Sequence, residues 1–411
     1  MKKLLLVSAI AASTLMASGY KIPEQSLNST ALAGAYVSNA NTADTAYYNP
    51  ANMAFMSADK HLELNAMYIH LTDVNFNGQV GASPVFSSKS EAENFVVPQM
   101  YLVSAPIDES GNVRLGLSMN APAGLSKRWE EGIPSLMANE FTLEVIEINP
   151  TISYRIMDNL AIAGGVRFVH TSGIVKVPGV AIPSGTPAGD LGTLDVEGSS
   201  WNMGYNLALS YKPMDMWGVA ATYRSKVNMS VEGGQKVTNP ALTAQGLNSI
   251  TASVAVPLPA VVTLATDVDV TSSTNIEFVY ERAFWSAYDE LQFTFGGQAA
   301  PADPKNWSDA NTFRLGLTQD LGDVDLMVGL AYDESPVPDE SLGFELPDSN
   351  AVIGSLGARW AVSDKLDLGA AVLYDKKEDR FVSRDDNAKG IDGTFSNSSA
   401  LLVSVGLGYK F

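Results

Sequence analysis

The sequence predicts an all-β fold, a fourteen-stranded antiparallel transmembrane β-barrel with an N-terminal plug inside its lumen. Three observations predict it. The chain opens with an export signal, apolar and polar residues alternate through most of the remaining chain, and the last alternating segment, 399–411, ends on Phe411. Alternation with a period of two is typical of a strand with one face in an apolar medium. Runs of roughly ten such residues can cross a bilayer as tilted strands.

Residues 1–18 predict a secretory signal peptide. Lys2 and Lys3 precede an apolar stretch, and small residues follow as far as Ala17 and Ser18. A segment of this kind is too short for a membrane helix and is cleaved on export. No later segment has the roughly 18 consecutive apolar residues of a membrane helix, so membrane residence is expected only as a barrel. These features predict the outer membrane of a Gram-negative bacterium.

The composition excludes several classes of function. The 411 residues include no cysteine, so neither disulfides nor thiolate chemistry are available. The three histidines, His61, His70 and His170, form no zinc motif, so neither a metal nor a cofactor is expected. The same shortage leaves no identifiable Ser/His/Asp set, which argues against an enzyme. A formal net charge of −19 argues against a nucleic-acid partner.

Fourteen segments carry the strand pattern, an even number that lets both termini lie on one side of the membrane. They lie near 60–72, 93–105, 112–122, 140–157, 160–177, 196–213, 216–231, 250–270, 273–296, 309–320, 322–333, 350–362, 365–377 and 399–411. Every second connection is short, whereas the intervening ones are long. Short periplasmic turns and long outer loops are typical of such barrels. Residues 59–411 are therefore predicted to form the barrel.

The alternation also predicts which side chains face the lumen. Arg167, Arg224, Lys226 and Arg314 fall on the face opposite to the apolar residues of their strands. An arginine facing lipid at the midplane would cost about 2–4 kcal/mol. These cations are therefore predicted to lie inside the barrel or near its rims.

Residues 19–58 do not have a strand pattern. They are rich in Ala, Ser, Asn and Gly and carry few charges. A segment of this kind could extend over the surface or fill the lumen. Small, uncharged residues favour the lumen, because a plug must pack closely against the barrel wall.

Several blocks of the sequence resemble the FadL-type (OmpP1/FadL/TodX) outer-membrane transporters of long-chain fatty acids and other hydrophobic compounds. The blocks are 18–26, 31–36, 43–51, 258–260 leading to Tyr280 and to 285–286, 332–338, and 346–348. The third of these ends in Asn49, Pro50 and Ala51. This tripeptide also occurs in aquaporins, but the chain has a single copy and no membrane helices. The resemblance covers essentially the whole mature chain and implies that 19–58 is a hatch inside the barrel.

The resemblance implies a route for the cargo. Outer loops capture it, a lumen pocket binds it, and movement of the hatch releases it sideways through a gap beside a kinked third strand. In this chain the third strand runs into Asn120 and Pro122, and proline cannot donate to a ladder. These two residues, with Asn49, Pro50 and Ala51, are the predicted gate. Ordinary strand termination before a loop explains Pro122 equally well.

Apolar outer loops support capture of a hydrophobic cargo. From Val237 to Thr266 no residue is charged, and Leu242, Leu247 and Ile250 are candidate binding residues. The family implies a basic residue near the ligand head, but the position aligned with it is Gln292.

Arg167 and Arg224 could replace that base, because an arginine fork fits a carboxylate. Pairing with a lumen carboxylate such as Asp267 is the competing interpretation. The cargo is therefore expected to be a long-chain fatty acid, with a neutral aromatic or aliphatic hydrocarbon as the alternative.

A general diffusion porin is the alternative from another class, but a lumen plug and charge-free outer loops argue against it. The expected partners are the cargo, the lipid bilayer with its lipopolysaccharide, and the barrel-assembly machinery, which would recognise Phe411. The protein is expected to act as a monomer.

Overall fold

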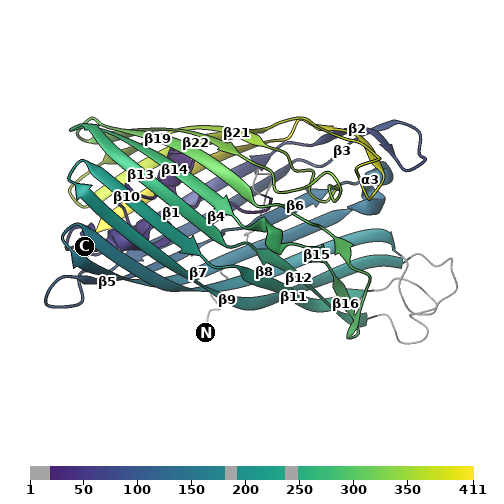
Figure 1. Ribbon diagram of the computed structural model, residues 1–411, viewed down its shortest axis with the longest axis horizontal. Coiled ribbons are helices and arrows are strands. Elements are labelled where there is room, and N and C mark those ends of the chain that lie inside the picture. Colours follow the sequence, from purple (N-terminus) through teal and green to yellow (C-terminus); the bar gives the residue numbers. More distant parts are fainter. Residues whose placement is uncertain (1–18, 181–191, 237–248) are drawn as a thin grey trace, which may run out of the picture.

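The computed structural model describes residues 19–180, 192–236 and 249–411. Within these ranges the chain forms the predicted closed antiparallel barrel of fourteen strands (Figure 1). Neighbouring wall strands pair in chain order, and the last strand pairs with the first, from His61 opposite Lys410 to Leu71 opposite Ala400. This last pairing closes the barrel.

The wall strands follow one another around the barrel, and three of them are each made of two consecutive pieces. They are β1 (His61–Leu71), β4 (Glu93–Val103), β5 (Val113–Asn120) with β6 (Gly124–Arg128), β7 (Glu140–Met157), β8 (Leu160–Val180), β9 (Gly192–Met214), β10 (Trp217–Arg224) with β11 (Val227–Lys236), β12 (Ser249–Leu258) with β13 (Val261–Thr271), β14 (Thr274–Ala283), β19 (Ala310–Asp320), β20 (Val324–Asp333), β21 (Ala351–Ala361), β22 (Leu366–Lys377) and β25 (Ser399–Lys410).

Short turns lie at one end of the barrel, where the C-terminus also lies, and long loops lie at the other (Figure 1). The long loops carry small elements: β2 (Asn75–Val80), β3 (Phe86–Lys89), α3 (Gly132–Met137), η2 (Trp285–Ala287), β15 (Glu290–Leu291), β16 (Phe293–Phe295), β17 (Gln298–Ala299), β18 (Asp303–Pro304), β23 (Arg380–Val382) and β24 (Ile391–Ser396). The predicted asymmetry of the connections is confirmed.

Two predicted strands are interrupted, and a third, 273–296, ends at Ala283. The segment 216–231 breaks at Ser225 and Lys226, and 250–270 breaks opposite them at Pro259 and Ala260. Proline has no amide hydrogen for the ladder, which explains the second break. The first break shifts the alternation by one residue, so Lys226 is exposed and Val227 is buried. The predicted lumen position of Lys226 is therefore wrong.

Elsewhere the side chains face as predicted. On β19 the side chain of Arg314 is buried, whereas Phe313 and Leu315 are exposed on the outer surface. On β8, Arg167 is buried between the exposed Val166 and Phe168. In the described ranges, no helix has both the length and the apolar character to span a membrane.

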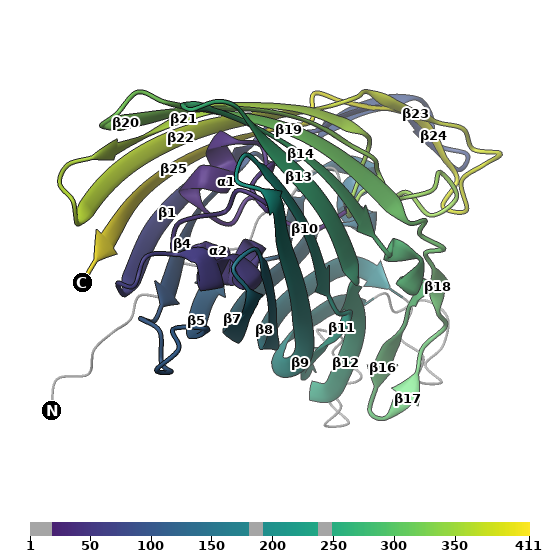
Figure 2. The ribbon, with the colours of Figure 1, turned by 60° about the vertical axis from the view of Figure 1, so that its left-hand side comes forward.

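The N-terminal segment lies inside the barrel, as predicted (Figure 2). It contains α1 (Leu27–Ala31), α2 (Thr45–Tyr48) and η1 (Pro50–Phe55). α1 packs against β21, β22 and β25, and η1 packs against β7, β8 and β9. Wall glycines permit this close packing, since a Cβ on Gly329 would lie 2.1 Å from the carbonyl carbon of Leu32. We call residues 19–58 the hatch.

Candidate functional site

An apolar pocket of about 100 Å³ lies between the outer loops and the hatch. Wall residues of β6, β7, β8, β9, β11 and β12 line one side, and the long loops line the other. Its lining includes Leu125, Phe141, Leu143, Ile174, Val175, Val196, Val231, Val254, Val256, Leu291, Phe293, Val337 and Leu346. Such a cavity can bind an apolar chain.

Tyr20 of the hatch forms part of the lining of this apolar pocket, within an aromatic cluster. Its ring centroid lies 4.7 Å from that of Trp285, 5.8 Å from that of Trp307 and 6.3 Å from that of Tyr288. Its hydroxyl donates to the carbonyl of Pro257. The start of the hatch therefore lies directly against the pocket.

An ion-paired lysine also lines the apolar pocket. Lys305 Nζ lies 2.8 Å from Asp303 Oδ2 and 2.9 Å from Glu345 Oε1, and Lys389 contacts Glu345 as well. Burial alone would raise the pKa of Glu345, but Lys305 and Lys389 outweigh it and hold this pKa well below its usual range. These contacts connect three outer loops over the pocket.

A second pocket, of about 70 Å³, lies beside the hatch, and we call it the charged pocket. Lys21, Arg167, Arg224 and Arg314 line it together with the carboxylate of Glu281. Lys21 forms an ion pair with Glu281, and Arg314 Nη1 lies 3.3 Å from Glu24 Oε1. Tyr20 lines the apolar pocket and Lys21 lines the charged pocket, so adjacent hatch residues separate the two.

The structure brings Arg167 and Arg224 together around Glu147 of β7. Arg167 Nε and Nη2 lie 2.9 Å and 2.8 Å from Glu147 Oε2, and Arg224 Nη2 binds Glu147 Oε1. The suggested partner Asp267 instead accepts a hydrogen bond of 2.6 Å from Ser38 Oγ. Sequence reasoning missed Glu147, although it falls on the lumen face of its strand.

The ladder between the second and third wall strands covers only part of their length. β4 pairs with β5 from Met100 opposite Met119 to Val103 opposite Gly116. In the described chain, residues 93–99 of β4 have no ladder partner on this side, although β7 pairs with both β5 and β6. We call this interruption of the wall the lateral gap. Its outer end is closed by Arg128, whose Nε lies 2.8 Å from Glu93 Oε1.

The third strand is interrupted at Ala121 to Ala123, where Pro122 was expected to break it. A second proline, missed by sequence reasoning, contributes. If the β4–β5 register continued beyond Met100 and Met119, Ala121 would face Pro98, which has no amide hydrogen. The predicted Asn120 is the last residue of β5.

Hatch residues pair with the interrupted strand. Ile22 N donates to Pro122 O at 2.9 Å, and Gly124 N donates to Tyr20 O at 2.9 Å. Gln25 binds the backbone of Ala121 twice, as its Nε2 donates to the carbonyl at 2.8 Å and its Oε1 accepts from the amide at 3.0 Å. A side-chain amide here replaces the missing ladder partner.

Asn49, Pro50 and Ala51 lie apart from the lateral gap. Asn49 caps η1 by accepting a hydrogen bond from Ala51 N at 3.3 Å, and its Nδ2 donates to Val37 O at 3.0 Å. Pro50 is the first residue of η1. The tripeptide therefore fixes the internal fold of the hatch.

Of the remaining predicted binding residues, only Gln292 has a described side chain, and it lines neither of the two pockets. Gln292 is exposed on an outer loop, and its Nε2 donates to Ala300 O at 3.1 Å. Its neighbours Leu291 and Phe293 do line the apolar pocket. Leu242 and Leu247 lie outside the described residues, and for Ile250, opposite Gln235 in the β11–β12 ladder, only the backbone is described.

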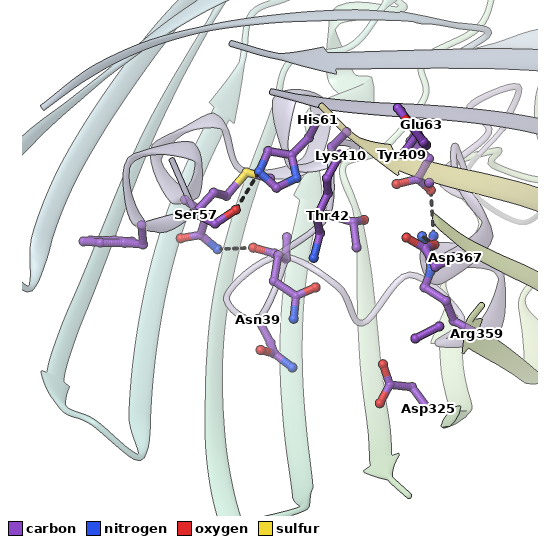
Figure 3. A pocket seen from close by; sticks show the side chains of 18 of the residues that line it. Asn39, Thr42, Ser57, His61, Glu63, Asp325, Arg359, Asp367, Tyr409 and Lys410 are labelled. Atoms are coloured by element: carbon purple, nitrogen blue, oxygen red, sulfur yellow. Dashed lines mark hydrogen bonds and ion pairs between the residues drawn. The ribbon is translucent and has the colours of Figure 1, made fainter. Parts of the chain in front are cut away.

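At the short-turn end the hatch borders a third pocket, of about 460 Å³ (Figure 3). Arg359 fastens the hatch here, because its Nε donates to Asn28 Oδ1 at 3.1 Å while its Nη2 lies 2.8 Å from Glu63 Oε1. On the other side Glu277 Oε1 accepts from Val37 N and Ser38 N at 2.8 Å and 2.6 Å. Residues 27–56 of the hatch are thus tied to the wall from two directions.

Among the described residues, no group of three or more His, Asp or Glu could hold a metal ion.

Comparison with known proteins gives a consistent result. The sequence model of the family described as outer membrane protein transport protein (OMPP1/FadL/TodX) matches residues 8–411. The 47 kDa outer membrane protein of Pasteurella multocida (strain Pm70) is 27% identical over 99% of this chain and 98% of its own length. The long-chain fatty acid transport protein of Escherichia coli O6:H1 is 22% identical, over 90% of each chain.

Solved structures share the fold. The crystal structure of a Pseudomonas aeruginosa FadL homologue has a TM-score of 0.83 at 20% identity, over 96% of this chain and 100% of that one. The crystal structure of the P. putida toluene transporter TodX has a TM-score of 0.70 at 17% identity, over 94% of this chain and 98% of that one.

Proposed function

The chain belongs to the OMPP1/FadL/TodX family of outer membrane transport proteins, and we propose that its cargo is a long-chain fatty acid. Members of this family are transport channels for fatty acids or other hydrophobic compounds, not enzymes, and the chain is an outer-membrane β-barrel. The observation that carries the proposal is a buried arginine pair next to an apolar pocket. An amphipathic molecule with an anionic head fits that combination.

Binding begins at the outer loops, which deliver the alkyl chain to the apolar pocket. Burial of each methylene group there contributes about 0.8 kcal/mol. Tyr20 lines this pocket, so a long chain has to displace the start of the hatch in order to descend. Arg167 and Arg224 then receive the carboxylate, since together they present more donors than Glu147 can occupy.

Release follows sideways through the lateral gap. Displacement of Tyr20 and Lys21 pulls on the segment that also carries Ile22 and Gln25, whose hydrogen bonds fill the interrupted strand. The rest of the hatch stays in place because Arg359 and Glu277 hold it. A cargo that cannot pass this fixed part leaves through the wall into the lipid phase.

A neutral hydrocarbon is the alternative cargo. Glu147 already balances part of the charge of Arg167 and Arg224, and the lining of the apolar pocket is almost wholly hydrocarbon. A general diffusion porin is disfavoured, because the hatch fills the lumen between the two ends.

Other parts of the proposal concern export and assembly. Residues 1–18, which lie outside the described residues, would be removed as a signal peptide, and 59–411 would function as the barrel around the hatch 19–58. The assembly machinery would recognise β25 and the exposed Phe411. The monomer would be the working unit in a bilayer with lipopolysaccharide in its outer leaflet.

Uptake of radiolabelled palmitate tests the cargo. The chain would be produced in a Gram-negative host that lacks its own long-chain fatty acid transporter. The proposal expects that uptake saturates as the palmitate concentration rises. Toluene should compete with this uptake only weakly. Uptake equal to that of host cells without the chain would contradict the proposal.

A further inference from the structure

Two buried side-chain amides at the inner end of the lateral gap, next to the last β4–β5 pair, have no hydrogen-bond partner among the described residues. Gln99 of β4 and Asn120 of β5 are each only 2% exposed, and neither the nitrogen nor the oxygen of either amide is paired. Buried polar groups in proteins are almost always paired, because an unpaired one loses its hydration without compensation. The two amides therefore require an explanation.

Their position is defined by the ladder. Met100 opposite Met119 is the last pair between β4 and β5, so Gln99 and Asn120 are the first residue of each strand beyond it. Both side chains face the lumen, and Gln99 lies at the start of the unpaired edge of β4. The two amides therefore lie at the end of the β4–β5 ladder, where the lateral gap begins.

Asn120 also neighbours the carboxylate that holds the arginine pair. It lies directly opposite Glu147 in the β5–β7 ladder, and side chains of such a pair project on the same face. Glu147 holds Arg167 and Arg224. A line of polar groups therefore runs along the inner wall from the arginine pair through Asn120 and Gln99 to the gap.

We infer that Gln99 and Asn120 form a transfer site for the carboxylate head of the cargo, between the arginine pair and the lateral gap. This inference rests on the proposed function. Each amide offers two N–H donors to a carboxylate. Both are neutral, so they bind the head less tightly than the arginines do and allow it to leave. Passage through a channel requires sites that bind well enough to admit the cargo and weakly enough to release it.

A purely structural role predicts hydrogen-bond partners, and within the described part of the chain these amides have none. The nearby Gln25, which could have bonded to them, uses its amide on Ala121 and Ile22. Apolar side chains of the same shape at 99 and 120 would therefore cost the fold nothing in hydrogen bonds. Gln99→Met and Asn120→Leu separate transfer of the head group from stability.

The experiment measures initial uptake of radiolabelled palmitate and toluene in the same host, with the full chain carrying Gln99→Met and Asn120→Leu together. Loss of one hydrogen bond to a charged group slows palmitate roughly tenfold, and toluene uptake stays unchanged. Palmitate affinity and thermal stability in detergent stay at wild-type values. Ser404→Ala is the matched control, because Ser404 Oγ is also buried and unpaired among the described residues but lies on β25.

Unchanged palmitate uptake in the double variant, or an equal loss for palmitate and toluene, overturns the transfer site while leaving the proposed function intact. Absence of palmitate uptake by the wild-type chain overturns both. A loss of thermal stability that accounts for the lower uptake assigns the amides a structural role and also rejects the site.

Discussion

Arg167 of β8 and Glu147 of β7 lie diagonally across adjacent strands of the lumen wall, with Arg167 Nε and Nη2 2.9 Å and 2.8 Å from one carboxylate oxygen. Both side chains are buried, and Arg224 contacts the second oxygen of Glu147. A buried charge pair contributes little net stability, whereas it is costly to break. Glu147 holds the guanidinium groups of Arg167 and Arg224 in the lumen when no cargo is bound. Both groups can then exchange contacts with an arriving carboxylate.

Arg167→Met or Arg224→Met should weaken binding of palmitate far more than binding of toluene. A hydrogen bond to a charged group contributes about 1.5–3 kcal/mol, so palmitate should lose roughly tenfold to a hundredfold in affinity. The affinities of both ligands are measured in detergent, from their competition with a fluorescent ligand. Equal effects on the two ligands, or none, would assign the arginines a structural role and favour a neutral cargo.

Gln25→Leu should loosen the hatch at the lateral gap. The change removes both bonds to Ala121, and since each neutral hydrogen bond contributes about 0.5–1.5 kcal/mol, protection of the Ala121 amide from hydrogen exchange should fall several-fold or more. Gln319→Leu is the matched control, because its amide bonds to Ser273 at the short-turn end. Undiminished protection at Ala121 would show that Gln25 does not fasten the hatch.

The barrel could be predicted from the sequence because facing depends only on local alternation, as Phe313, Arg314 and Leu315 illustrate. Contacts between distant strands could not be predicted, since they depend on register. Glu147 is one example, because alternation alone could not place it beside Arg167 and Arg224.

The lateral gap could likewise be predicted only in part from the sequence. Pro122 indicated an interruption, but Pro98 gains its meaning only from its place in the β4–β5 register. Gln292 was placed by alignment to a motif, and the loop that carries it turns it to the surface. The break at Ser225 could have been predicted only by knowing that Pro259 lies opposite this break on the neighbouring strand.

Deletion of residues 26–41 should open the lumen to ions. The segment includes α1 and the backbone amides of Val37 and Ser38, which bind Glu277. In planar bilayers the intact protein should show little steady conductance and the deletion should raise it severalfold. High steady conductance of the intact protein would revive the porin interpretation.

Hatch stability should fall as the pH rises through neutrality. Burial, followed by the nearby Glu63, raises the pKa of Asp44 from 3.8 to about 7. A carboxyl group with a raised pKa favours the folded hatch in its protonated form, so this stabilisation is complete below about pH 4 and is lost above about pH 7. Hydrogen-exchange protection of the amides around Thr42 and Asn49, corrected for intrinsic rates, should decline over that range. Asp44→Asn should abolish the decline, and its persistence in this variant would exclude Asp44 as the cause.

The central claim is that cargo leaves through the lateral gap, and a reversible cross-link at its outer end tests this claim most directly. Glu93→Cys and Arg128→Cys place thiols on the two sides of the gap, at the positions whose charged side-chain ends pair, in a chain with no other cysteine. Cysteine is shorter than either side chain, so a bis-thiosulfonate linker that forms a disulfide with each thiol spans the remaining distance. The control cross-link, Ser200→Cys with Ser230→Cys, joins β9 to β11 where the two hydroxyl oxygens lie 3.1 Å apart. Cross-linking of the first pair should abolish palmitate uptake, reduction should restore it, and cross-linking of the control should leave it unchanged. Full uptake with the first pair cross-linked would contradict lateral release.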